Sequence, residues 1–244
     1  MATTVILLVV KIDMTYQDKV VLGDCALYLG DCLTVMGGME DKSVDAVITD
    51  PPYGIDFKYN SHNDTSDGYG KWIWNVIELA ESKCSSGSPI FVFQAMPNIR
   101  KLAEWFPRDW RIFAAIKNFV QMRPTAMQYS YDPVLVWWTE GERYSEGTLS
   151  RDWFIGDTSP SSHRGLNNVD GHPCPRPLNQ IRHIVNQWVR PDGIVLDCFM
   201  GSGTTGIACV QTNRKFIGIE INETYFNIAK KRIETAQMQP NLGV

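Results

Sequence analysis

The sequence predicts a single α/β domain whose sheet is mainly parallel, and three observations support this fold class. Short apolar runs alternate with segments whose apolar residues recur at helical spacing, which is the order of a parallel sheet. Two of the apolar runs end directly in residues that can do chemistry. The chain has 244 residues, of which 44% are hydrophobic, so it can bury one substantial core.

The expected elements follow from apolar spacing and from the turn residues between them. The predicted strands are residues 19–22, 25–29, 45–49, 90–93, 111–116, 132–138, 194–197 and 215–219. The predicted helices are residues 33–36, 71–82, 98–105, 178–189 and 206–211. We expect the first two strands to form a hairpin about a Gly-Asp turn, and the strands at 111–116 and 132–138 to pair antiparallel.

Residues 50–54, Asp-Pro-Pro-Tyr-Gly, follow the apolar run at 45–49. Two prolines directly after a strand stop the ladder and prevent a helix, so the chain must turn sharply. The carboxylate of Asp50, two main-chain carbonyls and the ring of Tyr53 then lie at a strand's carboxyl end, where open α/β sheets hold ligands. A plain turn with an exposed ring is the alternative. The candidate catalytic residues are Asp50, Pro51, Pro52 and Tyr53.

These residue types suit an exocyclic base amine. The amino nitrogen of adenine or cytosine is a poor nucleophile because its lone pair is delocalised into the ring. If Asp50 and the Pro51 carbonyl accept its two hydrogens, the nitrogen moves toward tetrahedral geometry, and positioning and electrostatics do most of the catalysis. Tyr53 would stack on a base swung out of the duplex, since the amine cannot be reached inside the helix.

A second motif, at residues 199–205, follows the apolar run at 194–197 and reads Phe-Met-Gly-Ser-Gly-Thr-Thr. Glycines at such a turn let a ligand approach the backbone, and the helix that follows presents an N-terminus suited to a negatively charged group. Glu220 ends the next apolar run, where it can hold ribose hydroxyls as in dinucleotide-binding folds. Gly-x-Gly alone is weak evidence, and its pairing with Glu220 and the Asp50 loop gives it meaning.

Composition excludes several classes of protein. The six cysteines are scattered without a Cys-x-x-Cys pair, and the four histidines show no ligand spacing, so we expect no metal and no disulfide framework. The apolar run at 5–10 is too short to span a bilayer, and no basic residue precedes it. We therefore expect a cytoplasmic protein without membrane association, with residues 1–13 as an N-terminal extension.

The net charge of −4 argues against a strongly basic nucleic-acid binder, but the charges are unevenly distributed. Residues 100–123 carry six basic residues against two acids, which would form a local basic face or simply a solvated surface. In the connection at 117–131, Asn118, Phe119 and Arg123 suit contacts to a displaced nucleotide, and aromatic packing under a loop fits equally well. Residues 139–171 are polar, and we interpret them as a target-recognition insertion, with a surface loop as the alternative.

Over residues 20–235 the arrangement resembles the β class of amino-group DNA methyltransferases, which place the catalytic motif ahead of the cofactor motif. The resemblance implies a circularly permuted, Rossmann-like S-adenosylmethionine-dependent methyltransferase fold. Its sheet would have seven strands, mainly parallel with one antiparallel edge strand, and helices on both faces. The catalytic part would span residues 14–138, the recognition insertion 139–171 and the cofactor-binding part 172–244 of the same domain.

The resemblance also implies which residues bind S-adenosylmethionine, whose product is S-adenosylhomocysteine. Residues 172–177, His-Pro-Cys-Pro-Arg-Pro, match the family's His-Pro-Thr-Gln-Lys-Pro stretch, although Cys174 and Pro175 depart from it, and His172 can equally be structural. The implied cofactor residues are Asp31, Cys32, Asp50, His172, Arg176, Pro177, Asp197, Phe199, Met200, Gly201, Ser202, Gly203, Thr204, Thr205, Glu220 and Ile221.

The implied function is methylation of adenine N6 in double-stranded DNA, because Asp in the first position of the tetrad favours adenine in this family. Cytosine N4, RNA or protein glutamine as the acceptor, and a catalytically silent DNA-binding module, are the alternatives. We expect a bacterial or phage-encoded homodimer, and a cognate restriction endonuclease is left open. Besides Tyr53, the expected DNA contacts are Asn118, Phe119, Arg123, Arg143, Arg151 and Arg164.

Overall fold

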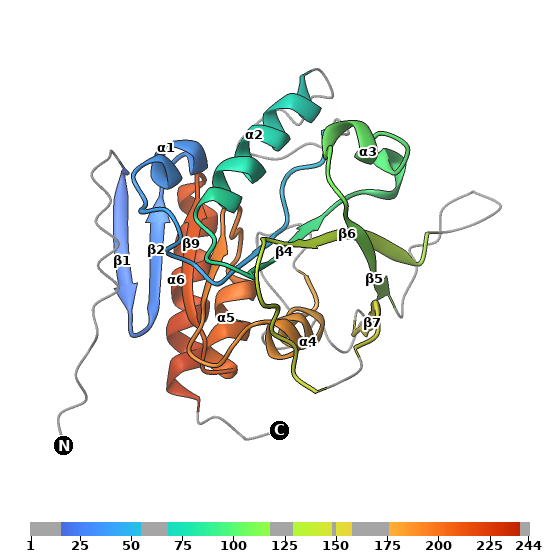
Figure 1. Ribbon diagram of the computed structural model, residues 1–244. Helices are drawn as coiled ribbons and strands as arrows, with labels where there is room; N and C mark the ends of the chain where they lie inside the picture. The colour runs from blue at the N-terminus through green and yellow to red at the C-terminus, as the bar shows by residue number, and fades with distance from the viewer. Residues whose placement is uncertain (1–15, 55–67, 118–128, 148–149, 158–175, 240–244) are drawn as a thin grey trace.

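A computed structural model of the chain describes residues 16–54, 68–117, 129–147, 150–157 and 176–239 (Figure 1). One nine-stranded sheet runs through these residues in the order β1-β2-β9-β8-β3-β4-β6-β5-β7. Its strands are β1 (Asp18–Leu22), β2 (Cys25–Leu29), β3 (Ala46–Thr49), β4 (Pro89–Phe93), β5 (Arg111–Lys117), β6 (Tyr131–Trp138), β7 (Trp153–Gly156), β8 (Ile194–Asp197) and β9 (Lys215–Glu220).

The centre of the sheet is parallel. β2, β9, β8, β3 and β4 all run in one direction, and β5 and β7 share it. β1 pairs antiparallel with β2 at one edge, and β6 pairs antiparallel with both β4 and β5. All four residues of β3 are buried because helices cover both of its faces, which explains why its sequence is a continuous apolar run without alternation.

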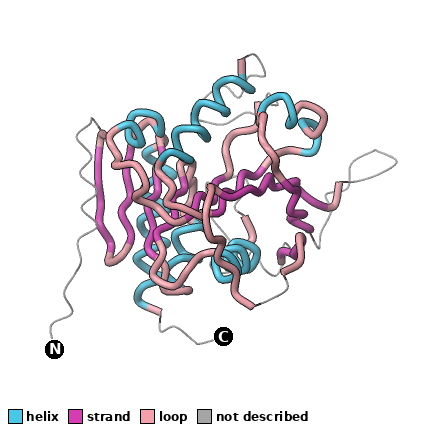
Figure 2. Tube along the Cα trace, viewed as in Figure 1, coloured by secondary structure: helices cyan, strands magenta, loops and turns pink. Residues whose placement is uncertain are grey.

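Helices cover the two faces in groups that follow the sequence (Figures 1 and 2). α1 (Cys32–Gly37), α2 (Tyr69–Ser82) and α3 (Leu102–Trp105) pack on one face, and the short 3₁₀ helix η1 (Met96–Asn98) precedes α3. α4 (Leu178–Trp188), α5 (Thr204–Gln211) and α6 (Glu223–Met238) pack on the other. The aromatic side of α2 is used internally, because Trp72 contacts Phe199 and Trp74 contacts Phe106.

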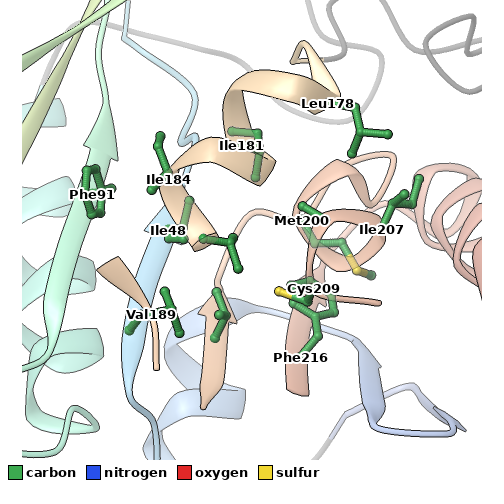
Figure 3. Close-up of a cluster of buried hydrophobic side chains, with 14 of the residues drawn as sticks. Ile48, Phe91, Leu178, Ile181, Ile184, Val189, Met200, Ile207, Cys209 and Phe216 are labelled. Atoms are coloured by element: carbon green, nitrogen blue, oxygen red, sulfur yellow. The ribbon is translucent and has the colours of Figure 1, made fainter. Parts of the chain in front are cut away.

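The core beneath α4 and α5 links the two halves of the chain. Ile48 of β3 and Phe91 of β4 lie beside Ile181 and Ile184 of α4, as Figure 3 shows. Each of these four side chains is 2% exposed or less. Burying one such side chain contributes about 1.5–3 kcal/mol. This packing fixes the strand that carries Asp50 against the helix that follows Arg176.

The predicted strands are all present, and the parallel α/β class is confirmed. The predicted count of seven strands was wrong, because the sheet has nine, and the antiparallel β6 lies inside the sheet rather than only at an edge. β7 was not predicted as a strand: Trp153 and Ile155 are exposed on its open side, so its apolar residues form no buried run. The helix predicted at 98–105 is shorter, and α6 was not predicted.

Two further expectations can be compared with the described residues only in part. Residues 1–13, Asn118, Phe119, Arg123, Arg164 and His172 lie outside them. In the part of the chain that the structure describes, no helix is long and apolar enough to cross a membrane.

Candidate active site

The candidate site lies at the edge of the sheet where the parallel strands end. β2, β9, β8 and β3 are neighbours and run the same way (Figure 1). Their carboxyl ends therefore deliver four acids to one edge, Asp31, Glu220, Asp197 and Asp50. A main-chain hydrogen bond of 2.9 Å from Gly30 to Glu220 ties the ends of β2 and β9 together. Topology thus collects in one row four acids that are spread along the sequence from residue 31 to residue 220.

The loop after β3 is held at both ends. Pro51 is buried, and Asn98 Nδ2 donates to the carbonyl oxygen of Tyr53 at 2.7 Å. Gly54 has φ +64°, and a Cβ added there would lie 2.5 Å from Cγ of Tyr69. Only glycine fits that position without a shift of the Tyr69 ring. The Asp50 loop is therefore anchored, as the two prolines predict.

Arg176 forms an ion pair with the carboxylate of Asp50. Its Nε lies 2.6 Å from Oδ2 of Asp50 and its Nη2 lies 2.9 Å from Oδ1, a bidentate ion pair. The hydroxyl of Tyr53 donates to the same Oδ1 at 2.5 Å and also contacts Arg176 Nη2. The sequence assigned Arg176 to the cofactor, whereas the structure places its guanidinium on the candidate catalytic acid.

Asp132 is the site residue that sequence reasoning missed. It lies at the start of β6, pairs with Arg176 Nη1 through Oδ2 and accepts a hydrogen bond of 2.7 Å from Lys117 Nζ through Oδ1. Burial raises the pKa of Asp132, and Lys117 opposes that shift. Because β6 is antiparallel, its first residues lie at the edge where its parallel neighbours end. An acid that opens an antiparallel strand is the signal that would have found it.

Asp197 braces the site from below. Its Oδ1 accepts hydrogen bonds from Thr49 Oγ1 at 2.9 Å and from the main-chain N–H of Phe199 at 3.1 Å, and its Oδ2 accepts one from Thr205 Oγ1 at 2.7 Å. The side chain is 3% exposed, and burial raises the pKa of Asp197 to about 6. These hydrogen bonds connect Asp197 to the end of β3 through Thr49 and to the start of α5 through Thr205.

The glycine-rich turn joins β8 to α5. Gly201 has φ +51° and Gly203 has φ +80°, values that disfavour other residues. A Cβ on Gly203 would lie 2.9 Å from Cβ of Ala229, so this glycine also lets α6 approach the turn closely. Arg232 of α6 donates to Ser202 Oγ at 3.0 Å, and the side chains of Ser202, Met200 and Thr204 are buried. Contacts with α6 therefore hold the turn.

Glu220 faces this turn. Its Oε2 accepts a hydrogen bond of 2.9 Å from the N–H of Gly201, and its Oε1 accepts one of 2.8 Å from the N–H of Asn222. Burial raises the pKa of Glu220 to about 7, because these backbone donors only partly offset the loss of water. Ile221 directly follows and is 56% exposed. A buried acid beside an exposed apolar side chain fits a ribose next to an apolar ring.

The end of β2 closes the row. Asp31 is exposed and caps α1, accepting hydrogen bonds from the N–H of Thr34 at 2.9 Å and from its hydroxyl at 3.0 Å. Cys32 is 6% exposed and packs in the core on the face of the sheet that α1 and α2 cover, and burial raises the pKa of its thiol to about 12.

Two further residues of the predicted cofactor site lie outside this row. Phe199 is half-buried against Trp72, at 5.7 Å between ring centroids. Pro177 precedes α4.

The two described arginines of the expected DNA surface lie in different places. Arg143 packs over the ring of Trp138, and Trp138 pairs with Pro89 at the amino end of β4, so Arg143 lies at the edge of the sheet opposite Asp50. Arg151 is exposed and packs over Trp153, at the start of β7. The structure therefore separates Arg143 from the candidate site. Among the described residues, no group of three or more side chains has the makeup of a metal site.

Fold and site together are those of a Rossmann-like methyltransferase: an acid in a Pro-Pro loop beside a glycine-rich turn that a second acid faces. The sequence model of a family described as DNA methylase, the N6/N4 methyltransferases, matches residues 44–231. The chain belongs to this DNA methylase family. The resemblance seen in the sequence is confirmed.

Curated relatives cover most of the chain. Type II methyltransferase M1.MboII of Moraxella bovis is 26% identical over 244 residues, which cover 82% of this chain and 92% of the relative. DNA adenine methyltransferase YhdJ of Escherichia coli strain K12 is 24% identical over 246 residues, which cover 85% of this chain and 82% of that protein.

Solved structures share the fold. The complex of M1.HpyAVI with SAM has a TM-score of 0.67 and 24% identity, covering 85% of this chain and 98% of that one. PvuII DNA methyltransferase, which is cytosine-N4-specific, has a TM-score of 0.72 and 16% identity, covering 94% of this chain and 92% of that one. The expected methyltransferase fold class is confirmed.

Proposed function

We propose that this DNA methylase transfers the methyl group of S-adenosylmethionine to the N6 amine of an adenine flipped out of double-stranded DNA. The observation that carries the proposal is the position of Asp50. Its carboxylate directly follows β3 on an anchored loop, one strand away from the turn after β8 and two strands away from the acid at the end of β9, which would hold the cofactor. Donor and acceptor of the methyl group would thus meet at one edge of the sheet.

The residues at the ends of β8 and β9 fit S-adenosylmethionine. Glu220 is a buried carboxylate that can accept ribose hydroxyls, and Ile221 offers an apolar surface for the adenine ring. Gly201 has a positive φ and no side chain, so the methionine part of the cofactor could approach its backbone closely. Asp31 follows Gly30, whose N–H donates to the carbonyl oxygen of Glu220, and it would therefore lie near the adenine of the cofactor. The relative M1.HpyAVI binds the same cofactor in a similar fold.

The cofactor supplies an electrophilic methyl group on a sulfonium. Asp50 and the Pro51 carbonyl would accept the two hydrogens of the base amine, so that the nitrogen lone pair faces the methyl carbon. The N–C bond forms as the C–S bond breaks, and the bonding pair of the C–S bond remains on sulfur. The methylated amine then loses one proton, which Asp50 is placed to accept. Positioning and electrostatics supply most of the rate.

Adenine is the proposed base because Asp, rather than Ser, opens the Pro-Pro tetrad. YhdJ is a DNA adenine methyltransferase, whereas the similar PvuII structure is that of a cytosine-N4-specific enzyme. Cytosine N4 is therefore the second candidate. Both bases present an exocyclic amine that the same two acceptors would bind, so the choice between them depends on the surroundings of the flipped base.

Sequencing with modified-base detection tests the function and the base together. DNA from cells that express the wild-type protein should carry N6-methyladenine in one sequence context. DNA from cells that express Asp50→Ala should not. N4-methylcytosine in a fixed context would reassign the base, and unmodified DNA with a folded, cofactor-binding protein would leave the silent DNA-binding module in its place.

Tyr53 is proposed to stack on the flipped base, and Tyr53→Ala should weaken capture of that base. Base–aromatic stacking is worth about 1–3 kcal/mol, so we expect KM for DNA to rise roughly tenfold or more. Tyr53→Phe keeps the ring and loses only the hydroxyl that donates to Asp50. Its effect should be mild, about 0.5–1.5 kcal/mol. Steady-state kinetics check this, and equal damage from both variants would favour a mechanism that depends on the hydroxyl.

Arg151, which lies just before β7, is proposed to contact a DNA phosphate. Arg151→Ala should weaken binding to all sequences alike and reduce the slope of log affinity against log salt by about 1. Arg143→Ala is the matched control, because Arg143 lies at the opposite edge of the sheet. Fluorescence anisotropy over a salt series checks this. An unchanged slope for Arg151→Ala, or an equal loss for Arg143→Ala, would refute this contact.

A homodimer is proposed because one subunit offers few DNA contacts. The open side of β5 and β7 carries Ile112, Ile116, Trp153 and Ile155 around a hollow of about 500 Å³. This surface is proposed as the interface rather than α2, because Trp72 and Trp74 of α2 pack against Phe199 and Phe106. Light scattering should give twice the mass of the 27.6 kDa chain. A monomer, both free and DNA-bound, would contradict the proposal.

A further inference from the structure

Arg176 is a charged side chain to which the proposed reaction assigns no role. It precedes α4, and its guanidinium lies between Asp50 after β3 and Asp132 on β6. Two of its nitrogens bind Asp50, and the third binds Asp132. The ring of Phe93 lies under the guanidinium, 4.7 Å from its carbon to the ring centroid. The arginine is thus fixed from two directions and from below.

The geometry constrains Asp50 as much as it constrains Arg176. A bidentate pair fixes the plane of the carboxylate, because two parallel N–H donors must meet its two oxygens. The Arg176 side chain is 17% exposed and that of Asp50 is 30% exposed, so Asp50 keeps an open side. A carboxylate has about four lone-pair sites, and three donors occupy Asp50 here. One site remains for a hydrogen of the base amine.

Arg176 is the cation paired with Asp50 among the described residues. Asp132 on β6 and Asp197 on β8 are carboxylates near enough to Asp50 to interact with it, and both are largely buried. Within the described residues, the facing cations are Arg176 and, beyond Asp132, Lys117 of β5. Tyr53 is another titratable group in contact. Without Arg176, the described ion pairs would leave Lys117 as the partner of Asp132 and no cation beside Asp50.

We propose that Arg176 is a positioning residue for methyl transfer, which Asp132 holds in place and which orients the carboxylate of Asp50 toward the target amine. This inference rests on the proposed function. The bidentate pair fixes the plane of the carboxylate, and the lone pair left free in that plane would accept a hydrogen of the amine. Arg176 acts through Asp50 and touches neither the base nor the transferred methyl group.

The test compares Arg176→Gln, Arg176→Lys and Asp132→Asn with the wild type. Single-turnover methyl transfer to DNA is measured across pH, and affinity for S-adenosylhomocysteine is measured by calorimetry. Arg182→Gln on α4 removes one positive charge outside the site and is the control. Circular dichroism and thermal melting establish that each variant folds, and Arg176→Lys keeps the test informative if Arg176→Gln does not.

For Arg176→Gln we expect a fall in the single-turnover rate of about tenfold or more, because Asp50 loses the bidentate partner that fixes the plane of its carboxylate. S-adenosylhomocysteine affinity should change less than about twofold, since the arginine contacts Asp50 and Asp132. Arg176→Lys should restore only part of the rate, because an ammonium lacks the planar fork. Asp132→Asn should give a smaller fall of the same kind.

Two outcomes would overturn the inference. An unchanged single-turnover rate with weakened S-adenosylhomocysteine binding would assign Arg176 to the cofactor, as the sequence resemblance implied. A faster rate in Arg176→Gln would mean that the arginine blocks Asp50. If the folded wild-type protein itself transfers no methyl group to DNA, the proposed function fails and the inference fails with it, and that result is distinct from both.

Discussion

Asp50→Ala should abolish methyl transfer while leaving cofactor affinity nearly unchanged. Loss of a preorganised acceptor costs about 10²-fold or more in rate, and Asp50 is proposed to bind the target amine, whereas Glu220 contacts the glycine-rich turn. Arg176 and Tyr53 lose a partner in this variant, so Asp50→Asn, which keeps the shape of the side chain, should accompany it. Transfer of tritiated methyl groups to DNA gives the rate, and calorimetry gives the affinity for S-adenosylhomocysteine.

Asp109→Ala is the control for this prediction, because Asp109 is an exposed acid on the loop between α3 and β5. It should transfer methyl groups at the wild-type rate. Near-wild-type turnover in Asp50→Ala would remove Asp50 from the reaction. A loss of cofactor affinity as large as the loss of rate would place Asp50 at the cofactor instead.

Glu220→Gln should weaken cofactor binding and remove its dependence on pH. Hydrogen bonds to a charged group are worth about 1.5–3 kcal/mol each, so the loss should be about tenfold or more. In the free protein, burial raises the pKa of Glu220 to about 7, and ribose hydroxyls donate to the ionised form. Affinity should therefore rise with pH up to about 7 and then level off, by at most about tenfold per unit.

The raised pKa of Glu220 also makes the stability of the folded protein depend on pH. Because the folded-state pKa of Glu220 is raised, the stability linked to its protonated form is present at low pH and is lost as the pH rises through about 7. The cofactor should oppose this loss by favouring the ionised carboxylate. The stabilisation by S-adenosylhomocysteine in a thermal melt should accordingly be larger above pH 7 than below it.

Calorimetry in two buffers of different ionisation enthalpy checks the Glu220 prediction directly. Binding below pH 7 should release up to about one proton in the wild type and none in Glu220→Gln. Glu223→Gln, an exposed acid in the first turn of α6, should match the wild type. Wild-type affinity that is flat across pH would mean that Glu220 does not change its ionisation when the cofactor binds.

The strands and the two motifs were predictable because their signals are local. The run at 45–49 is buried on both faces, and the prolines after it end the strand in any context. The glycine-rich turn likewise follows from an apolar strand, two glycines and a helix start. The acid at 220 was predictable because Glu220 directly ends a buried apolar strand.

The remaining site features depend on contacts that no short stretch encodes. Arg176 lies 126 residues from Asp50 in sequence, and only the packing of α4 under β3 brings them together. Asp132 was missed because its importance follows from the antiparallel direction of β6. Asp197 was assigned to the cofactor, but its hydrogen bonds to Thr49 and Thr205 become visible only once β3 and β8 are known to be neighbours.

The most direct test of the central claim is mass spectrometry of DNA treated with the purified protein and S-adenosylmethionine that carries a deuterated methyl group. After digestion to nucleosides, we expect N6-methyladenine with the labelled methyl group in the wild-type reaction and none in the Asp50→Ala reaction. Labelled N4-methylcytosine would keep the amino-methyltransferase and change the base. If a folded protein that binds the cofactor leaves the DNA without any labelled nucleoside, the proposal that it methylates DNA is contradicted.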